Sequence, residues 1–180
     1  MLVCDLSHEN SIELLTHLRL GRIACAQGSQ PYVVPFYFAY QGNYLYSFST
    51  VGQRIEWMRA NPLVCVETDQ IVSPEEWATL VIFGRYEELP DTPASKSERE
   101  FAFKLLQRIG VWWKPGYAKT VIAGVERPLV PLYFRIEIRE ISGHHAMPDP
   151  AGSVEETQSQ RKTTATNSFR KLLDRVRAKS

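Results

Sequence analysis

The sequence lacks the features that would point to a membrane, secreted or nucleic-acid-binding protein. No apolar run approaches the ~20 residues that a membrane-spanning helix needs. Residues 1–20 contain Asp5, His8, Glu9 and Glu13, where a signal peptide would have a basic start and an apolar core. The formal net charge is only +1, so the total charge gives no reason to expect nucleic acid or an acidic partner. The sequence therefore favours a soluble cytoplasmic protein without a nucleic-acid or membrane partner.

Cysteine is also scarce. Cys4, Cys25 and Cys65 are far apart, and the chain has no CxxC motif or Cys/His cluster, which disfavours a structural zinc site or a redox dithiol. Two of the three lie in apolar strand-like runs, so we expect buried, reduced thiols. His144 and His145 end the last predicted strand without further metal ligands nearby. We expect them to be solvent-exposed, and we expect no metal site.

Short alternating runs joined by turns dominate the chain and predict six strands. The predicted strands are residues 22–27, 31–40, 44–49, 63–68, 77–89 and 129–141, with a loop at 71–76. Helical patterns follow Asn10, whose spacing to Glu13 resembles a capping box, and lie also at 53–61 and 95–108, the last with Phe101, Leu105 and Ile109 at helical spacing. The first three strands are separated only by turns, which predicts an antiparallel meander and disfavours a doubly wound parallel sheet.

Together these elements predict a mainly β fold with peripheral helices, in which about six antiparallel strands form a closed or nearly closed barrel. A chain of 180 residues is long enough for one such domain and a tail. We place the domain at residues 1–147.

The composition changes at Pro148, and residues 148–180 read as a tail. The polar stretch after Pro148 has too little apolar content to fold alone and predicts a flexible linker. Residues 168–177 then predict a short basic amphipathic helix, with one apolar stripe made of Phe169, Leu172, Leu173 and Val176. This helix would dock on its own domain, on a second copy or on an acidic surface, or it would be a frayed tail.

Residues 44–62 form the most informative stretch, because an alternating strand runs directly into a helix. Ser49 and Thr50 offer hydroxyls and a helix N-cap, and Gly52 allows close backbone approach. Arg54 is unexpected in a first helical turn, where a cation opposes the helix dipole by roughly 0.3 to 1 kcal/mol. A bound anion would reverse that sign, so the stretch predicts a phosphate site. The alternative is a capped surface helix with a solvated arginine.

Four segments, in order, carry a family resemblance: PYVVPFYFAY, YLYSFSTVGQRIEWMRANPLVCVET, WATLVIFGRYEEL and YFRIEIREISG. This order is similar to that of the FMN-binding split barrels related to pyridoxamine 5′-phosphate oxidase, and most similar to the branch with the nitroimidazole-resistance proteins. The resemblance covers roughly residues 21–143. It implies a six-stranded antiparallel split β-barrel and a homodimer with one FMN near each end of the subunit interface.

The resemblance also implies which residues bind FMN. The strand beside the isoalloxazine ring would contain Val34, Pro35, Phe36 and Tyr37. The ring and ribityl chain would be lined by Ser47, Phe48, Ser49 and Thr50. Gln53 and Arg54 would hold the phosphate, with Thr79 as a small polar group near it.

Two departures from the family limit the chemistry. Relatives often carry a histidine beside the flavin where this chain has Phe48, so a histidine-based mechanism is not expected. The chain offers one arginine, Arg54, where vitamin-B6 oxidases use several basic residues, so it lacks the basic cluster that a second phosphate on the substrate would need. Oxidation of pyridoxamine phosphate is therefore not expected.

The resulting hypothesis is an FMN-dependent oxidoreductase that passes electrons from reduced nicotinamide, NAD(P)H, to a small electron-poor acceptor. In such a protein the cofactor carries the redox step and the chain orients and shields it. The alternative is a flavin or haem binding or sensing protein without turnover. The loop with Trp112, Trp113 and Tyr117 would form either a substrate lid or part of a dimer interface.

Overall fold

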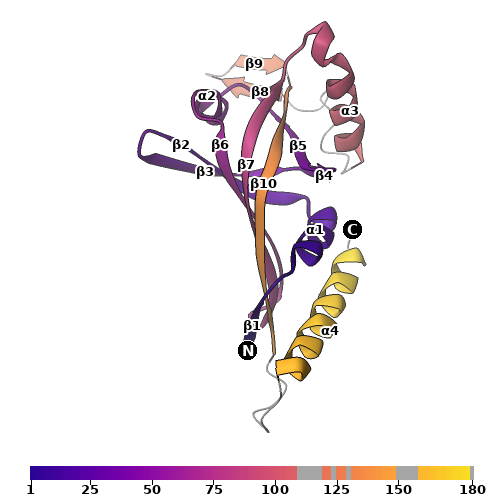
Figure 1. Ribbon diagram of the computed structural model, residues 1–180. Helices are drawn as coiled ribbons and strands as arrows, with labels where there is room; N and C mark the ends of the chain where they lie inside the picture. Colours follow the sequence, from indigo (N-terminus) through magenta and orange to yellow (C-terminus); the bar gives the residue numbers. More distant parts are fainter. Residues whose placement is uncertain (109–118, 123–124, 129–130, 149–157, 179–180) are drawn as a thin grey trace. The chain divides into compact units, whose positions relative to one another are not determined.

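A computed structural model describes residues 1–108, 119–122, 125–128, 131–148 and 158–178. These residues form one large sheet, a separate hairpin and several helices (Figure 1). The first half of the chain contains β1 (Leu2–Asp5), α1 (His8–His17), β2 (Leu20–Gln27), β3 (Gln30–Tyr37), β4 (Ala39–Gln41), β5 (Tyr44–Ser49), α2 (Gln53–Ala60), β6 (Leu63–Ser73) and β7 (Glu76–Leu89). The second half contains the 3₁₀ turn η1 (Pro93–Ser95), α3 (Lys96–Gln107), β8 (Lys119–Ile122), β9 (Val125–Pro128), β10 (Leu132–Met147) and α4 (Gln158–Arg177).

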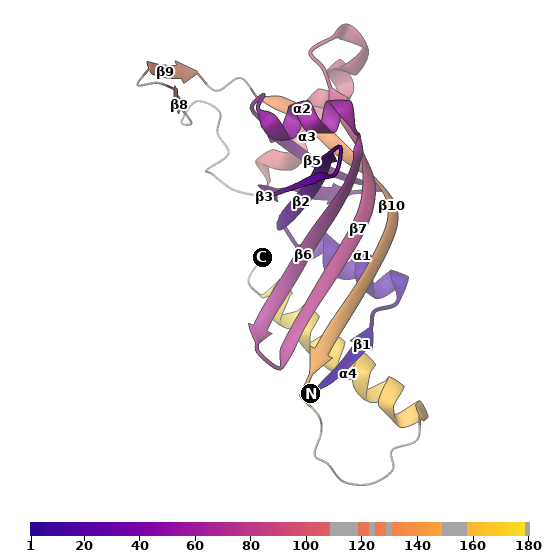
Figure 2. The ribbon, with the colours of Figure 1, turned by 90° about the vertical axis from the view of Figure 1, so that its left-hand side faces the viewer.

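The large sheet has eight strands in the described part of the chain, in the order β3-β2-β6-β7-β10-β5-β4, with β1 paired to β10. Each strand pair for which a register is given is antiparallel. Figure 2 shows β6, β7 and β10 as long neighbouring strands. The prediction of a mainly β, antiparallel fold is therefore confirmed. The predicted count of six strands is too low, because β1 was not expected and residues 30–41 form two strands instead of one.

The chain changes partner at Phe38, between β3 and β4. Before it, β3 pairs with β2 throughout its length; after it, β4 pairs with β5. The Phe38 amide donates to the Arg19 carbonyl at 2.8 Å, and the fully buried Phe38 side chain anchors the bend. Consequently β3 and β4 occupy the two ends of the sheet order although one residue separates them. The predicted meander is wrong at this point, since the strand before β5 is split between two partners.

The strands owe their boundaries to turns that the sequence only partly reveals. Gly28 and Gly42 have positive φ in the β2–β3 and β4–β5 turns, a conformation that glycine adopts without strain. The loop predicted at residues 71–76 is largely absent: β6 continues to Ser73, only Pro74 and Glu75 form the turn, and β7 begins at Glu76. The last strand starts later and ends later than predicted.

Two compact units divide the chain. One consists of Met1–Leu18, Glu67–Ile82 and Ile141–Ser180, and the other of Arg19–Val66 and Phe83–Glu140. We call them the terminal unit and the central unit. The strands β6, β7 and β10 each contribute residues to both. The predicted boundary between a domain and a tail near residue 148 stays a prediction.

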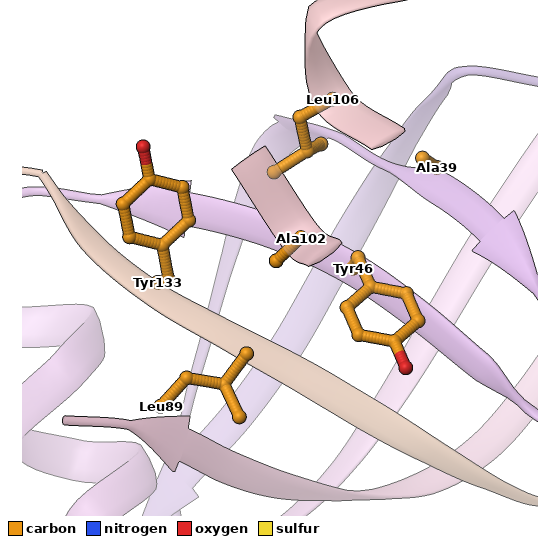
Figure 3. Close-up of a cluster of buried hydrophobic side chains, with 6 residues drawn as sticks. All are labelled: Ala39, Tyr46, Leu89, Ala102, Leu106 and Tyr133. Carbon is orange, nitrogen blue, oxygen red and sulfur yellow. The ribbon is translucent and has the colours of Figure 1, made fainter. Parts of the chain in front are cut away.

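In the central unit, α3 covers β5 with a small apolar cluster. Figure 3 shows Ala102 and Leu106 of α3 facing Tyr46 of β5 and Tyr133 of β10. The spacing of Phe101, Leu105 and Ile109 predicted a different buried face. Phe101 is instead 43% exposed while Ala102 and Leu106 are buried, and Ile109 lies outside the described residues. The small Ala102 side chain lets the helix approach the strands.

In the terminal unit, two helices pack against each other (Figure 1). The N-cap of α1 is Ser7, whose hydroxyl accepts from the Asn10 amide at 3.2 Å, so the capping box predicted at Asn10 is wrong. The other helix, α4, is 20 residues long and starts well before the predicted residue 168. Its predicted apolar stripe is confirmed, since these four side chains are all buried: Phe169, Leu172, Leu173 and Val176.

Ion pairs attach α4 to its own chain. Arg177 pairs with Glu13 of α1, and Arg175 pairs with Glu76 of β7. Of the alternatives for the tail, the described residues show docking on the same chain. No helix among the described residues is both long enough and apolar enough to cross a membrane.

The expectation of two exposed histidines is wrong for one of them. His144 is exposed and its ring lies 3.0 Å from the Asp5 carboxylate. His145 is buried, because the Phe169 ring of α4 packs against it with ring centroids 5.6 Å apart. Cys25 is also buried, as expected, whereas Cys4 and Cys65 are half-buried.

Candidate functional site

The candidate site lies where β5 ends and α2 begins, in the central unit. Gly52 is the N-cap of α2 and provides no side-chain hydrogen bond, so the prediction that Ser49 or Thr50 caps the helix is wrong. The Ser49 hydroxyl instead accepts a hydrogen bond of 2.6 Å from the Arg54 guanidinium. Because the cap is a glycine, the amides of the first turn of α2 receive no side-chain oxygen from their own cap.

Arg54 is a half-buried cation that pairs with no acidic side chain among the described residues. Its guanidinium lies over the ring of Phe134, 5.8 Å from the ring centroid. Among the residues that the structure describes, no carboxylate lies within ion-pair distance of it, and Ser49 is its one hydrogen-bond partner. Burial lowers the pKa of Arg54 from its ordinary value. An arginine still stays charged at neutral pH, so most of its five N–H donors are available to an anion.

The two faces of β5 have different surroundings. Ser47 is buried and its hydroxyl donates to the Tyr37 carbonyl at 2.7 Å. Phe48 points to the other face, where it packs against the Tyr133 ring and the cluster under α3. The structure therefore brings together Tyr37 with Ser47, and Ser49 with Arg54, but places Phe48 apart from the serines.

The four residues predicted beside the flavin ring divide over the two faces of β3. Phe36 is buried and Val34 half-buried, while Pro35 and Tyr37 alternate with them on the exposed face. In the register with β2, Pro35 lies opposite Arg22. β3 ends the sheet order, and an edge position is where a strand tolerates proline.

Three more of the predicted residues belong to the described part of the chain. Thr50 and Gln53 are exposed on either side of Gly52. Thr79 belongs to the terminal unit, where its hydroxyl donates to Glu67 at 3.2 Å. The predicted lid residues Trp112, Trp113 and Tyr117 lie outside the described residues.

Sequence reasoning missed a network next to Arg54. Arg59, one turn and a half further along α2, donates from Nε and Nη2 to the two carboxylate oxygens of Glu88, at 2.8 and 2.9 Å. The Tyr86 hydroxyl also donates to Glu88, at 3.1 Å. The Tyr86 ring in turn packs on Phe134, with centroids 5.4 Å apart. No local pattern links residues that are 29 positions apart, so the sequence carried no signal for this network.

Two pKa shifts accompany the network. The hydrogen bond from Arg59 is the largest cause that lowers the pKa of Glu88. Burial, reinforced by the charge of Glu88, raises the pKa of Tyr86. At neutral pH Glu88 is thus ionised and paired with Arg59, whereas Arg54 has no carboxylate partner in the described part of the chain. The arrangement can hold an anionic group such as a phosphate.

Comparisons with known proteins identify a family and related structures. The family model described as pyridoxamine 5′-phosphate oxidase matches residues 7–145. An uncharacterised protein of Rhizobium meliloti (strain 1021) is 38% identical over 146 residues, which are 81% of this chain and 97% of that protein.

Solved structures with the same fold include a FAD-binding protein from Mesorhizobium loti, with a TM-score of 0.68 and 44% identity over 81% of this chain and 99% of that one. A candidate 5-nitroimidazole antibiotic resistance protein from Bacteroides thetaiotaomicron shares the fold at 16% identity, with a TM-score of 0.57 over 81% of this chain and 89% of that one.

Proposed function

The chain belongs to the pyridoxamine 5′-phosphate oxidase family, and from this premise we propose that it is a flavoprotein that binds a flavin phosphate at Arg54. The half-buried guanidinium, for which the described chain supplies no carboxylate partner, carries this proposal. Desolvating a cation is costly unless an opposite charge compensates it. A phosphate on Arg54 would supply that charge and accept several of its N–H donors.

FMN is the form of the cofactor that we propose. Ser49 and Arg54 form a compact seat for one phosphate, and exposed Thr50 and Gln53 lie beside it. The Mesorhizobium loti protein is described as FAD-binding, and FAD has the same phosphate next to its ribityl chain. Chromatography of the flavin released from the purified protein distinguishes the two, and FAD alone in the released fraction would contradict FMN.

The proposed activity is an oxidoreductase reaction. When bound, the flavin supplies electron transfer from a reduced nicotinamide to a small electron-poor acceptor. The chain's own residues would bind and orient: Arg54 would hold the phosphate, Ser49 would fix the guanidinium, and the β3 edge would lie beside the flavin ring.

The test is direct. We expect the purified protein to be yellow, and the flavin-loaded protein to consume NAD(P)H with nitroaromatics or quinones faster than the same concentration of flavin alone. A colourless protein that does not bind added FMN contradicts the proposal.

Binding without turnover is a second candidate function. None of the residues predicted to bind the flavin is a carboxylic acid, histidine or lysine, and Phe48 packs under α3. A flavin that stays bound without NAD(P)H consumption above that of free flavin would favour storage or sensing. A red protein with a haem absorption spectrum would indicate that the protein binds haem instead of flavin.

We also propose that the protein is a homodimer. In the central unit, Leu63 of β6 and Phe83 of β7 are 55% and 50% exposed on neighbouring strands. Exposed large apolar side chains on adjacent strands favour burial against a partner. Light scattering of the wild type and of Phe83→Glu measures this: the wild type should have twice the chain mass, and the variant a larger monomer fraction. A monomeric wild type contradicts the dimer.

A further inference from the structure

We propose that Glu88, Tyr86 and Arg59 are positioning residues that hold the Arg54 guanidinium in place for the flavin phosphate. This inference rests on the proposed function, because it concerns the same site. None of the three is expected to touch the ligand. They would act through Phe134 and through the orientation of α2.

The first route runs through ring contacts. Glu88 accepts the Tyr86 hydroxyl at 3.1 Å, and the Tyr86 ring packs 5.4 Å from the Phe134 ring. Arg54 then lies over that Phe134 ring. Phe134 is fully buried and Tyr86 nearly so. Because close-packed rings transmit small displacements, fixing the Tyr86 hydroxyl limits where the guanidinium can lie.

The second route runs through the helix. Arg54 and Arg59 both belong to α2, and Arg59 is bound by a two-pronged contact to Glu88 of β7. Such a paired contact fixes orientation as well as distance. The contact therefore limits rotation of α2 about its axis. Such a rotation would move Arg54 away from Ser49.

The charges support the same assignment. Arg59 pairs with Glu56 at 2.9 Å as well as with Glu88. Glu56 of α2 and Glu88 of β7 therefore both pair with Arg59 and not with Arg54. Arg59 is thus neutralised by two acids, whereas no described carboxylate pairs with Arg54. Holding a hydrogen-bond donor in place before the ligand binds raises ligand affinity.

The experiment compares FMN with riboflavin, which lacks the phosphate, by fluorescence titration of the full-length protein. In Glu88→Gln we expect the Kd for FMN to rise about tenfold while the Kd for riboflavin stays within about twofold, because only the phosphate contact depends on Arg54 placement. Tyr86→Phe keeps the ring and loses the hydroxyl, so it should give a smaller rise in the same direction.

The swapped pair Arg59→Glu with Glu88→Arg tests the helix route. It exchanges the two charges and should recover part of the FMN affinity that Arg59→Glu alone loses. Lys104→Ala, which removes an exposed cation from α3, is the control and should change neither Kd. Circular dichroism and thermal unfolding identify any variant that does not fold, in which case Glu88→Asp replaces Glu88→Gln.

Each outcome is decisive. Equal rises of the FMN and riboflavin Kd values would show that the network only maintains the local structure, and would overturn the positioning role. Unchanged Kd values in both Glu88→Gln and Tyr86→Phe would also overturn it. If the wild type binds neither flavin, the proposed function fails and this inference fails with it. If the wild type binds FMN more tightly than riboflavin and the variants do not alter that ratio, only this inference fails.

Discussion

The helices α2 and α4 both carry arginines, but they use them differently. In α4, Arg175 and Arg177 are half-exposed and each pairs with an acidic side chain of the terminal unit. In α2, Arg59 is paired in the same way, whereas Arg54 is buried further and, among the described residues, contacts a hydroxyl and an aromatic ring but no carboxylate. Arginines that attach a helix have their charge matched by the fold. Arg54, whose charge no described carboxylate matches, is the arginine that we propose for the ligand.

Stability and flavin affinity are two properties that one substitution often changes together, and in this protein we expect them to depend on different helices. Changes in α4 should alter the free energy of unfolding and leave flavin affinity unchanged. Changes at Arg54 should do the reverse.

The largest effect is expected in α4, at Phe169. The side chain is almost completely buried and contacts His145, so Phe169→Ala should lower the free energy of unfolding by about 3–5 kcal/mol. Urea unfolding measures this, and Lys171→Ala on the exposed side of α4 is the matched control. The flavin Kd of the folded variant should equal that of the wild type; a change in that Kd would end the separation between the two helices.

The next effect is expected at Arg54. Arg54→Ala should weaken FMN binding by about 1.5–3 kcal/mol, which is roughly a 10- to 150-fold rise in Kd, for the loss of charge-assisted hydrogen bonds. The free energy of unfolding should change little, because no ion pair of Arg54 with a described residue is lost. Lys104→Ala serves again as the control. An unchanged FMN Kd in Arg54→Ala would show that Arg54 is a surface arginine and nothing more.

A smaller effect concerns pH and Glu88. The pKa of Glu88 is lowered in the fold, so its ion pair stabilises the protein above the ordinary carboxyl pKa of 4.5, and this stabilisation is lost as the pH falls through the lowered value. At neutral pH, Glu88→Gln should reduce the free energy of unfolding by on the order of 1 kcal/mol, since the Glu88 side chain is only 26% exposed. The difference between variant and wild type should shrink below pH 4.5 and vanish in stronger acid. A difference that is constant from pH 7 to pH 3 contradicts the assigned pair.

The smallest effect is expected at Arg177, whose ion pair with Glu13 is exposed. Arg177→Ala should cost about 0.2–1 kcal/mol, decreasing as salt is added. Urea unfolding at low and high salt measures it, with Lys171→Ala, which removes an exposed cation from the same helix, as the comparison. A loss as large as that of Phe169→Ala would mean that charge, and not the apolar stripe, holds α4.

Local periodicity predicted the strands well and their ends poorly. The alternation in β5 and β7 gave both strands within a residue. Residues 71–76 are predicted to form a loop, whereas β6, although polar at Asp69 and Gln70, continues beside β7 as far as Ser73. Burial of His145 depends on Phe169, which follows 24 positions later, so no window around His145 contains the cause.

The candidate site was predicted in part, for a reason that its residues make clear. The mismatch between Arg54 and the helix dipole is local, so the neighbouring sequence is enough to draw attention to the start of α2. Phe134, Tyr86 and Glu88 come from distant strands and left no trace in the neighbouring sequence. Phe48 is instructive, because the alternation already placed it opposite Ser47 and Ser49, whereas the family resemblance grouped all three; the structure follows the alternation.

The bend at Phe38 has a consequence for how this chain avoids self-association during folding. It leaves β3 and β4 as the two ends of the sheet order, and the edges of a sheet are templates for aggregation. β4 is only three residues long, and β3 contains Pro31 and Pro35, each of which removes an amide donor. Pro35, which is also predicted to lie beside the flavin ring, thus hinders the addition of another strand to β3. The variant Pro35→Val is expected to fold into the same sheet but to form edge-paired aggregates on refolding at high concentration.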